Sequence, residues 1–432
     1  MNYEPIIGLE IHVQLNTKSK LFCACSAEHF GKEPNSQVCP VCLGLPGAIP
    51  SPPNIEAVKK AVLIAKALGC ALADNCYFER KCYFYPDLPK GFQISQHHTA
   101  IGERGEFEGV RVRRVHLEED AAKLVHEEKC TLIDFNRAGV SLVEIVTEPV
   151  LKSSSRAKYF LKELQKLFRH LGVSDADMEK GSLRLEANIS LKRAGAKKLP
   201  GYRVELKNLN SFNFLAKALD VEIARQEKIL QSGRCVVQET RGYNGKTGKT
   251  YSQRRKEAAS DYRYFPEPDL PPLTVKSLLC EERIVRPEEL RQRLEKEYGL
   301  SRRYARALVA NPKLLALSER VMKEAGGMVG AEYAVNAIIN HRFGDPAKLG
   351  ARGLVKAMAT EKAKKEALLS GKEIGPLVDE AVSANPQAVS DYRAGKRAAL
   401  QFLLGQLMRE TGGRINPKDV QKMLEKKLGG KK

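Results

Sequence analysis

Four cysteines near the start of the 432-residue sequence have spacing that suits a metal site. They form two close pairs, Cys23 with Cys25 and Cys39 with Cys42, and the second pair lies in the segment CPVC. Four thiolates arranged in this way can enclose a zinc ion in a tetrahedron. The first pair is C-x-C rather than the commoner C-x-x-C, so reduced structural thiols stay open as the alternative. The other cysteines are scattered, and we expect them to be structural: Cys70, Cys76, Cys82, Cys130, Cys235 and Cys280.

Acidic residues are concentrated at one point of a basic chain. HLEEDAAKL (116–124) has three consecutive acids, although the formal net charge is +20. A solvated turn is the ordinary reading of such a run. However, Glu144 lies in the apolar segment SLVEIVTEP, where an unpaired carboxylate is costly. Carboxylates and an imidazole suit Mg²⁺, which keeps phosphate oxygens and waters as further ligands. We therefore predict a catalytic magnesium site that holds a triphosphate and consists of Glu10, His12, Glu119 and Glu144.

Two loops bear comparison with nucleotide-binding motifs. KCYFYPDLPKGFQISQHH (81–98) combines aromatic rings with a lysine, which would suit a base and its phosphates, although aromatic loops more often cover a core. GYNGKTGKT (242–250) has Tyr243 where the phosphate-binding pattern G-x-x-x-x-G-K-[ST] needs glycine. We predict a hairpin turn for the second loop.

The strands that must position these groups are amphipathic. GLEIHVQL (8–15), LRLEANISL (183–191) and YRVELKNL (202–209) alternate apolar and polar residues, so each has one polar side. Such alternation ordinarily means one face on a core and one in water. Acids together with histidine or asparagine on several strands favour a sheet whose polar face is a working surface. We expect nucleotide and substrate contacts from this face and from the 81–98 loop, at Tyr85, Lys90, Gln96, Glu186, Asn188 and Lys207.

The chain divides into regions of different composition. Residues 1–275 mix strands and helices, whereas residues from 285 onward read as successive helices, and the proline-rich YFPEPDLPPLTV (264–275) lies before the change. Helix breaks at NP and GGRINP favour a separate helical tail, 368–432. We predict an α+β protein, with a first domain on a mostly antiparallel sheet, a helical domain 285–367 and the tail.

Charge and hydrophobicity restrict the class of protein. The sequence has no run of about 20 apolar residues and no signal-peptide pattern at its start, so we expect a cytoplasmic protein without a membrane span. From Ser301 to the end, 25 basic residues stand against 13 acidic ones. General solubility could explain this surplus, but nucleic acid is the better interpretation. The expected tail contacts are Arg393, Lys396, Arg397, Arg409, Arg414 and Lys418.

Taken in order, these segments resemble the GatB family, which forms part of glutamine-dependent aspartyl/glutamyl-tRNA amidotransferases. The segments cover nearly the whole chain: GLEIHVQLNTKSKLFC, VCPVCLGLPGA, YFYPDLPKGFQISQ, HLEEDAAKL, DFNRAGVSLVEIVTEP, VELKNLNSF, DYRYFPEPDLPPL, ANPQAVSDYRAGK and GGRINPKDV. The resemblance implies a catalytic cradle domain, a helical domain and a YqeY-like tail that binds tRNA.

The resemblance also implies two reactions. ATP phosphorylates the side-chain carboxylate of Asp or Glu on a misacylated tRNA, and ammonia then displaces the phosphate to give Asn-tRNA or Gln-tRNA. The implied partners are a GatA-type glutaminase subunit that makes the ammonia and a small GatC-type subunit, together forming a heterotrimer. The family's metal and phosphate site falls on Glu10, His12, Glu119 and Glu144, and its zinc ligands fall on the four paired cysteines.

The sequence departs from the family pattern at two places. Leu185 and Glu186 stand where many relatives have Cys-Asp, so the acid is one methylene longer. The stretch 320–370 is shorter than usual. A GatE-type subunit, which shares the cradle, would need a large inserted domain for which there is no room. A noncatalytic tRNA-binding protein would be favoured if Glu10, His12 or Glu119 were missing, and all three are present.

Overall fold

The computed structural model describes residues 3–196, 198–255, 262–278, 285, 287–366, 369–412 and 414–429. Cys280 and the predicted first residue of the tail, 368, lie outside these ranges. The chain forms two compact units, Met1–Glu297 with Ala305–Pro312, and Tyr298–Tyr304 with Lys313–Lys432. Each unit is described by itself.

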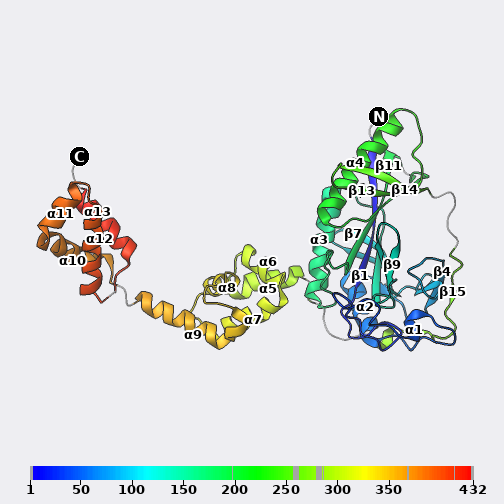
Figure 1. Ribbon diagram of the computed structural model, residues 1–432, viewed down its shortest axis with the longest axis horizontal. Helices are drawn as coiled ribbons and strands as arrows, with labels where there is room; N and C mark the ends of the chain where they lie inside the picture. Colours follow the sequence, from blue (N-terminus) through cyan, green and yellow to red (C-terminus); the bar gives the residue numbers. More distant parts are fainter. Residues whose placement is uncertain are drawn as a thin grey trace. The chain divides into compact units, whose positions relative to one another are not determined.

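The described residues of the first unit build a nine-stranded sheet (Figure 1). Neighbouring strands are antiparallel, except that β12 and β13 are parallel. The fold class predicted from the sequence is thus confirmed. In spatial order the strands are β14 (Lys249–Arg255), β13 (Glu239–Asn244), β12 (Val204–Lys207), β11 (Leu183–Arg193), β1 (Tyr3–Gln14), β10 (Ser141–Thr147), β7 (Val110–Glu119), β6 (Gly102–Phe107) and β2 (Ala71–Leu72).

Three helices contribute to the apolar core against this sheet: α2 (Ile55–Ala67), α3 (Ser154–His170) and α4 (Phe212–Gln231). Each begins at a residue whose side chain accepts a backbone N–H of the first turn, namely Asn54, Ser153 and Ser211. Ile7, Leu9, Ile11 and Val13 of β1 are buried in the same core. Because side chains alternate along a strand, Glu10 and His12 point to the opposite face of the sheet.

Smaller elements flank the sheet. Strands β15 (Phe265–Pro266), β4 (Glu79–Cys82) and β5 (Phe92–Ser95) form a second sheet, and β16 (Leu273–Thr274) pairs with β3 (Asn75–Cys76). Helix α1 (Pro40–Leu43) contains Cys42. Strands β8 (Lys123–His126) and β9 (Thr131–Asp134) form a hairpin. The hairpin predicted for residues 242–250 is confirmed, since β13 and β14 pair antiparallel around it.

The rest of the described chain is helical. One hydrophobic cluster joins α7 (Pro312–Ala325), α8 (Ala331–Ile339) and α9 (Pro346–Glu366), and a separate cluster joins the four tail helices. The remaining elements are η1 (Lys276–Leu278), α5 (Pro287–Tyr298), α6 (Arg302–Val309), α10 (Gly371–Ala384), α11 (Pro386–Arg393), α12 (Ala398–Glu410) and α13 (Pro417–Leu428). The boundaries at 275, 285 and 368 stay predictions. Every helix in the described ranges is too short or too polar to cross a lipid bilayer.

Candidate active site

A row of polar side chains crosses four neighbouring strands on the face opposite the core. His12 of β1 is paired in register with Glu144 of β10 and with Arg184 of β11, and Glu144 is paired with His116 of β7. Residues paired in this way project from the same face of a sheet. Strand register therefore brings together groups that are far apart in the sequence.

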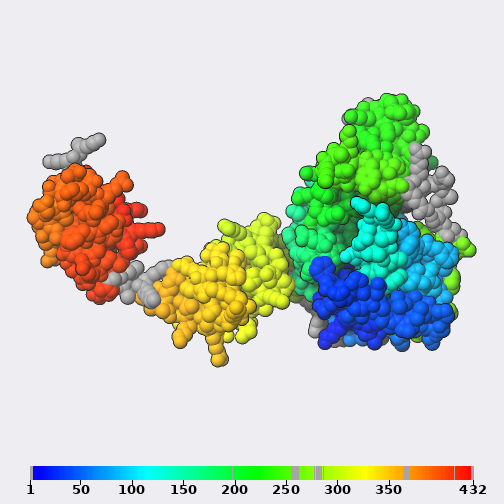
Figure 2. All heavy atoms as spheres, in the orientation of Figure 1, coloured from blue at the N-terminus to red at the C-terminus, as the bar shows by residue number. Residues whose placement is uncertain are grey.

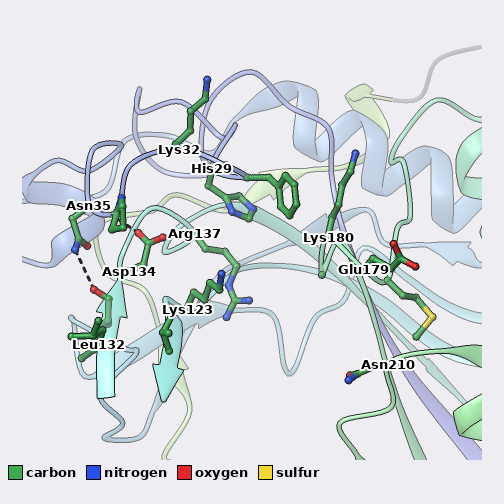
Figure 3. A pocket seen from close by; sticks show the side chains of 17 residues that line it. His29, Lys32, Asn35, Lys123, Leu132, Asp134, Arg137, Glu179, Lys180 and Asn210 are labelled. Carbon is green, nitrogen blue, oxygen red and sulfur yellow. Dashed lines mark hydrogen bonds between the residues drawn. The ribbon is translucent and has the colours of Figure 1, made fainter. Parts of the chain in front are cut away.

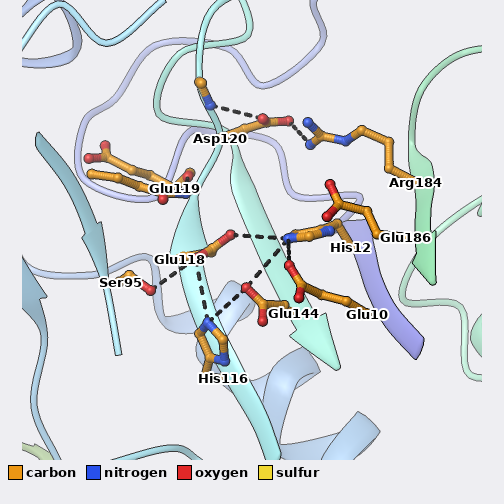
Figure 4. A network of polar contacts seen from close by, with 12 residues as sticks. Glu10, His12, Ser95, His116, Glu118, Glu119, Asp120, Glu144, Arg184 and Glu186 are labelled. Carbon is orange, nitrogen blue, oxygen red and sulfur yellow. Dashed lines mark hydrogen bonds and ion pairs between the residues drawn. The ribbon is translucent and has the colours of Figure 1, made fainter. Parts of the chain in front are cut away.

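This row is the centre of a cluster of carboxylates and imidazoles (Figure 4). His12 Nε2 lies 3.4 Å from Glu144, and 3.8 Å from each of Glu10 and Glu118. His116 Nε2 lies 3.4 Å from both Glu118 and Glu144. The ligand atoms of Glu10, His12 and Glu144, and likewise those of His116, Glu118 and Glu144, lie within 4.8 Å of one another. Glu144 thus belongs to two overlapping sets of possible metal ligands.

The electrostatics of the cluster are those of a cation site without its cation. Burial lowers the pKa of His12, but the hydrogen bond and charge of Glu144 outweigh it and raise this pKa to about 9. Burial, and then the charge of Glu144, raises the pKa of Glu10 to about 7. Burial would raise the pKa of Glu144 as well, but His116 and His12 hold it well below its usual range. Protons on the imidazoles therefore neutralise the acids, and a divalent cation would take their place.

Glu119 does not belong to this cluster. It projects from β7 to the other side from Glu118, because adjacent residues of a strand alternate, and Figure 4 shows Glu118 directed towards His12 and Glu119 directed away. Its Oε1 accepts a hydrogen bond of 2.9 Å from Ile94 N and forms an ion pair with Lys90. The position expected for Glu119 among the metal ligands is occupied by Glu118. His116 is an additional candidate ligand that the sequence analysis missed.

Asp120, the third acid of the run, has its own partners. It binds Arg184 at 2.5 Å, and Arg137 lies 3.7 Å away. Burial would raise the pKa of Asp120, but Arg184 and Arg137 hold it below its usual range. This buried pair fixes Arg184 on the polar face, next to the cluster.

The residues expected to contact nucleotide and substrate lie in different places. Lys207 Nζ is 2.8 Å from Glu186, which is paired in register with Glu10, so both lie on the polar face. The buried Oδ1 of Asn188, from the same strand as Glu186, has no hydrogen-bond partner among the described residues. A buried oxygen of this kind suits a ligand contact.

The three residues expected from the 81–98 loop are not brought to the cluster. Tyr85 is exposed, and Lys90 pairs with Glu119. Gln96 is fully buried, accepts a hydrogen bond from Leu117 N and donates one to Cys76. Its contacts are those of a structural residue that fastens this loop to β7.

The four paired cysteines form a second candidate metal centre. Their sulfur atoms lie within 4.8 Å of one another, and those of Cys39 and Cys42 are 3.9 Å apart. A zinc–sulfur bond of about 2.3 Å places the sulfurs of a tetrahedral site about 3.8 Å apart. The geometry therefore fits a four-cysteine zinc site.

A buried lysine contacts this centre and was missed from the sequence. Lys20 is fully buried, and its Nζ donates hydrogen bonds to Cys42 Sγ at 3.5 Å and to the carbonyl of Phe135 at 3.4 Å. The pKa of Cys42 is lowered to about 4, first by the hydrogen bond from Cys23 and also by the charge of Lys20. Nothing in the segment NTKSKLFC distinguishes Lys20 from a solvent-exposed lysine.

The six basic residues expected to bind nucleic acid are all exposed or half-buried on the tail helices and their connections: Arg393, Lys396, Arg397, Arg409, Arg414 and Lys418. Lys396 pairs with Asp391 at 3.1 Å. An exposed pair of this kind is weak and exchanges readily for another anion.

Comparison with known proteins decides the family. A model of the GatB/GatE catalytic domain matches residues 5–281, and a model of the GatB domain of YqeY type matches residues 350–428. The chain belongs to the GatB family. Relatives from Persephonella marina, Thermotoga maritima and Thermus thermophilus are each 40% identical to it, over 478, 483 and 471 residues. These alignments cover 99 to 100% of this chain and of each relative.

All three relatives carry the name of the GatB component of an aspartyl/glutamyl-tRNA(Asn/Gln) amidotransferase. Their alignments are longer than the 432 residues of this chain, so they contain segments that it lacks. That the missing segments belong to the stretch 320–370 stays a prediction. The GatB family includes subunits of amidotransferase complexes, and membership of it implies use of ATP.

Proposed function

We propose that this chain is the subunit of a tRNA-dependent amidotransferase that phosphorylates the side-chain carboxylate of Asp or Glu on a misacylated tRNA and then directs ammonia to that carboxyl. The carrying observation is the cluster of Glu10, His12, His116, Glu118 and Glu144 on the polar face. Its carboxylates and imidazoles match what a magnesium–triphosphate site requires, in a chain aligned over its full length with amidotransferase subunits of the GatB family.

Phosphorylation is needed because a free carboxylate is a poor acyl donor, with oxide as its leaving group. When bound, Mg²⁺ would neutralise charge on the phosphoryl oxygens. Glu144 and its neighbours would hold that ion. Arg184, fixed by Asp120, and Lys207 lie on the same face and would bind the anionic groups of the two substrates. Asn188 Oδ1 offers a further hydrogen-bond acceptor.

Three further parts of the proposal have separate supports. The four-cysteine centre would hold structural zinc, as its sulfur geometry suits. The basic residues of the tail would bind tRNA away from its acceptor end. A GatA-type glutaminase subunit would supply ammonia, with a small GatC-type subunit completing the heterotrimer. These partners follow from the family, whose relatives are named as one subunit of an amidotransferase.

The experiment is an assay of the full-length chain assembled with glutaminase and small subunits. We expect ATP hydrolysis and amidated tRNA only when Asp-tRNA(Asn) or Glu-tRNA(Gln) is added. Uncharged tRNA and correctly charged Asn-tRNA(Asn) are the controls. Hydrolysis at the same rate with uncharged tRNA, or no amidated product from either misacylated tRNA, would reject the proposal. Assaying both misacylated tRNAs also decides which one is the substrate.

A further inference from the structure

A large pocket lies beside the polar face, outside the metal-ligand cluster. It has a volume of about 980 Å³, at the upper end of the range for small-molecule sites. Its walls come from three segments: residues 29–35, the β8–β9 hairpin and residues 178–181 (Figure 3). In Figure 2, cyan atoms, the colour of the hairpin, and dark blue atoms of the N-terminal segment face the viewer on one side of the first unit.

The pocket is attached to the strands of the candidate active site. Residues 29–35 follow β1, the hairpin connects β7 to β10, and residues 178–181 precede β11. Two contacts join the pocket wall to these strands. His29 Nε2 lies 2.8 Å from the side-chain amide nitrogen of Gln14, two residues from His12, and Arg137 lies 3.7 Å from Asp120.

The pocket is also close to the cluster along the chain. Lys123, in its wall, is five residues after Glu118, and five residues span at most about 18 Å. A ligand in the pocket that is one or two nucleotides long could therefore present a reactive group to the polar face. This proximity separates the pocket from a remote surface hollow.

The pocket lining combines aromatic and cationic groups. Phe30 is 61% exposed, and Lys180 Nζ lies 5.9 Å from its ring centre. Figure 3 shows the lining cations Lys32, Lys123 and Arg137 together with Lys180. Two acids line the pocket as well, Asp134 and Glu179, so the basic residues are in excess. An exposed ring for stacking a base, surrounded by cations for phosphates, is how proteins bind single-stranded nucleic acid.

We propose that this pocket binds the single-stranded 3′ end of the misacylated tRNA, with a terminal base stacked on Phe30 and backbone phosphates near Lys123 and Lys180. This inference rests on the proposed function, since it names the subsite of the same substrate. A nucleoside triphosphate is the competing occupant. The carboxylate and imidazole cluster that suits its magnesium lies on the sheet and not in the pocket lining.

The test is a binding cycle with the assembled complex. Affinity is measured for intact tRNA and for the same tRNA lacking its 3′-terminal nucleotides, in the wild-type complex and in Phe30→Ala. Stacking of one base contributes about 5- to 150-fold in affinity, so the wild type should prefer intact tRNA by that factor. Phe30→Ala should lose most of the preference, and Phe30→Trp should restore it. Because Phe30 is exposed, its replacement should not disturb folding.

Two controls separate the pocket from general effects. Tyr159→Ala removes another exposed aromatic ring, on α3, and should keep the preference for intact tRNA. Lys180→Gln should flatten the log–log salt dependence of binding by about 0.7 for each phosphate contact that is lost. Binding of a non-hydrolysable ATP analogue should be equal in wild type and Phe30→Ala.

The outcomes also distinguish the pocket from the proposed function. If the wild type prefers intact tRNA and amidates it, but Phe30→Ala keeps the full preference, the pocket proposal is wrong and the function stands. If Phe30→Ala weakens binding of the ATP analogue and keeps the tRNA preference, the pocket holds the nucleotide. If the wild-type complex neither prefers intact tRNA nor amidates it, the proposed function itself fails.

Discussion

Replacing Lys20 with methionine should weaken zinc binding without destabilising the metal-free protein. Lys20 is fully buried, and its ammonium donates to Cys42 Sγ at 3.5 Å. A zinc ion with four thiolates carries a net charge of −2, so the lysine would neutralise part of a buried charge. Methionine has a similar length and shape but carries neither charge nor N–H donor.

The expected magnitude follows from the distance. Two unit charges 3.5 Å apart interact by about 5 kcal/mol at an effective dielectric constant near 20, before any desolvation is subtracted. Removing a hydrogen bond to a metal ligand typically costs 10- to 100-fold in affinity. We therefore expect zinc affinity to fall by about 1.4 to 2.8 kcal/mol. The metal-free protein should unfold at the same temperature or higher, because a buried ammonium is no longer desolvated on folding.

Zinc affinity is measured on the full-length chain by competition with a chromophoric chelator, and stability by thermal unfolding with and without a metal-stripping agent. Lys18→Met is the matched control, since Lys18 lies in the same segment but is exposed. The reasoning is refuted if Lys20→Met and Lys18→Met bind zinc equally well. It is also refuted if Lys20→Met lowers the unfolding temperature of the metal-free protein, because Lys20 would then stabilise the fold itself.

Three further predictions follow from the same structure. Glu118→Gln should lower Mn²⁺ affinity, measured by calorimetry, more than tenfold, whereas Glu119→Gln should change it by a few-fold at most, and equal effects would place both acids at the metal. Mn²⁺ affinity should rise with pH between about 6 and 9, with proton release, because His12 with a pKa of about 9 and Glu10 with a pKa of about 7 must lose their protons to the cation; a flat profile would contradict this. Deleting the tail helices α10 to α13 should weaken tRNA binding and flatten its log–log salt dependence by about 0.7 to 0.9 for each lost phosphate contact, while equal slopes would show that the tail does not bind tRNA.

The sequence predicted the sheet and two of its site residues for a physical reason. Alternation in β1 separates Ile11 and Val13 from Glu10 and His12, and a strand with one buried face must show this period. Glu144 was found because a carboxylate between apolar residues needs a partner. These signals are local, so they can be read without knowing which strands are neighbours.

The missed residues depend on contacts that no local pattern contains. Lys20 is buried by Cys42 and by Phe135, which is 115 residues away in sequence. For Glu118 a local signal did exist. Val115 and Leu117 are buried on the core side of β7, which places the residues between and after them, including Glu118, on the polar face. The presence of three acids in a row concealed this alternation.

The acidic run of a basic chain is not a solvated turn, because Glu118, Glu119 and Asp120 are each only 3% exposed. Alternation along the strand and its end directs the three carboxylates to three sets of cations. Glu118 meets the imidazoles of the cluster, Glu119 meets Lys90, and Asp120 meets Arg184. Lys90 in turn packs against Gly44, directly after the helix that contains Cys42, and a side chain at Gly44 would collide with it. A shift of the run by one residue would therefore exchange these partners and leave buried charges unpaired, which costs several kcal/mol for each. The run is concentrated because one strand end connects the metal cluster, the cysteine centre and the arginine beside the substrate face.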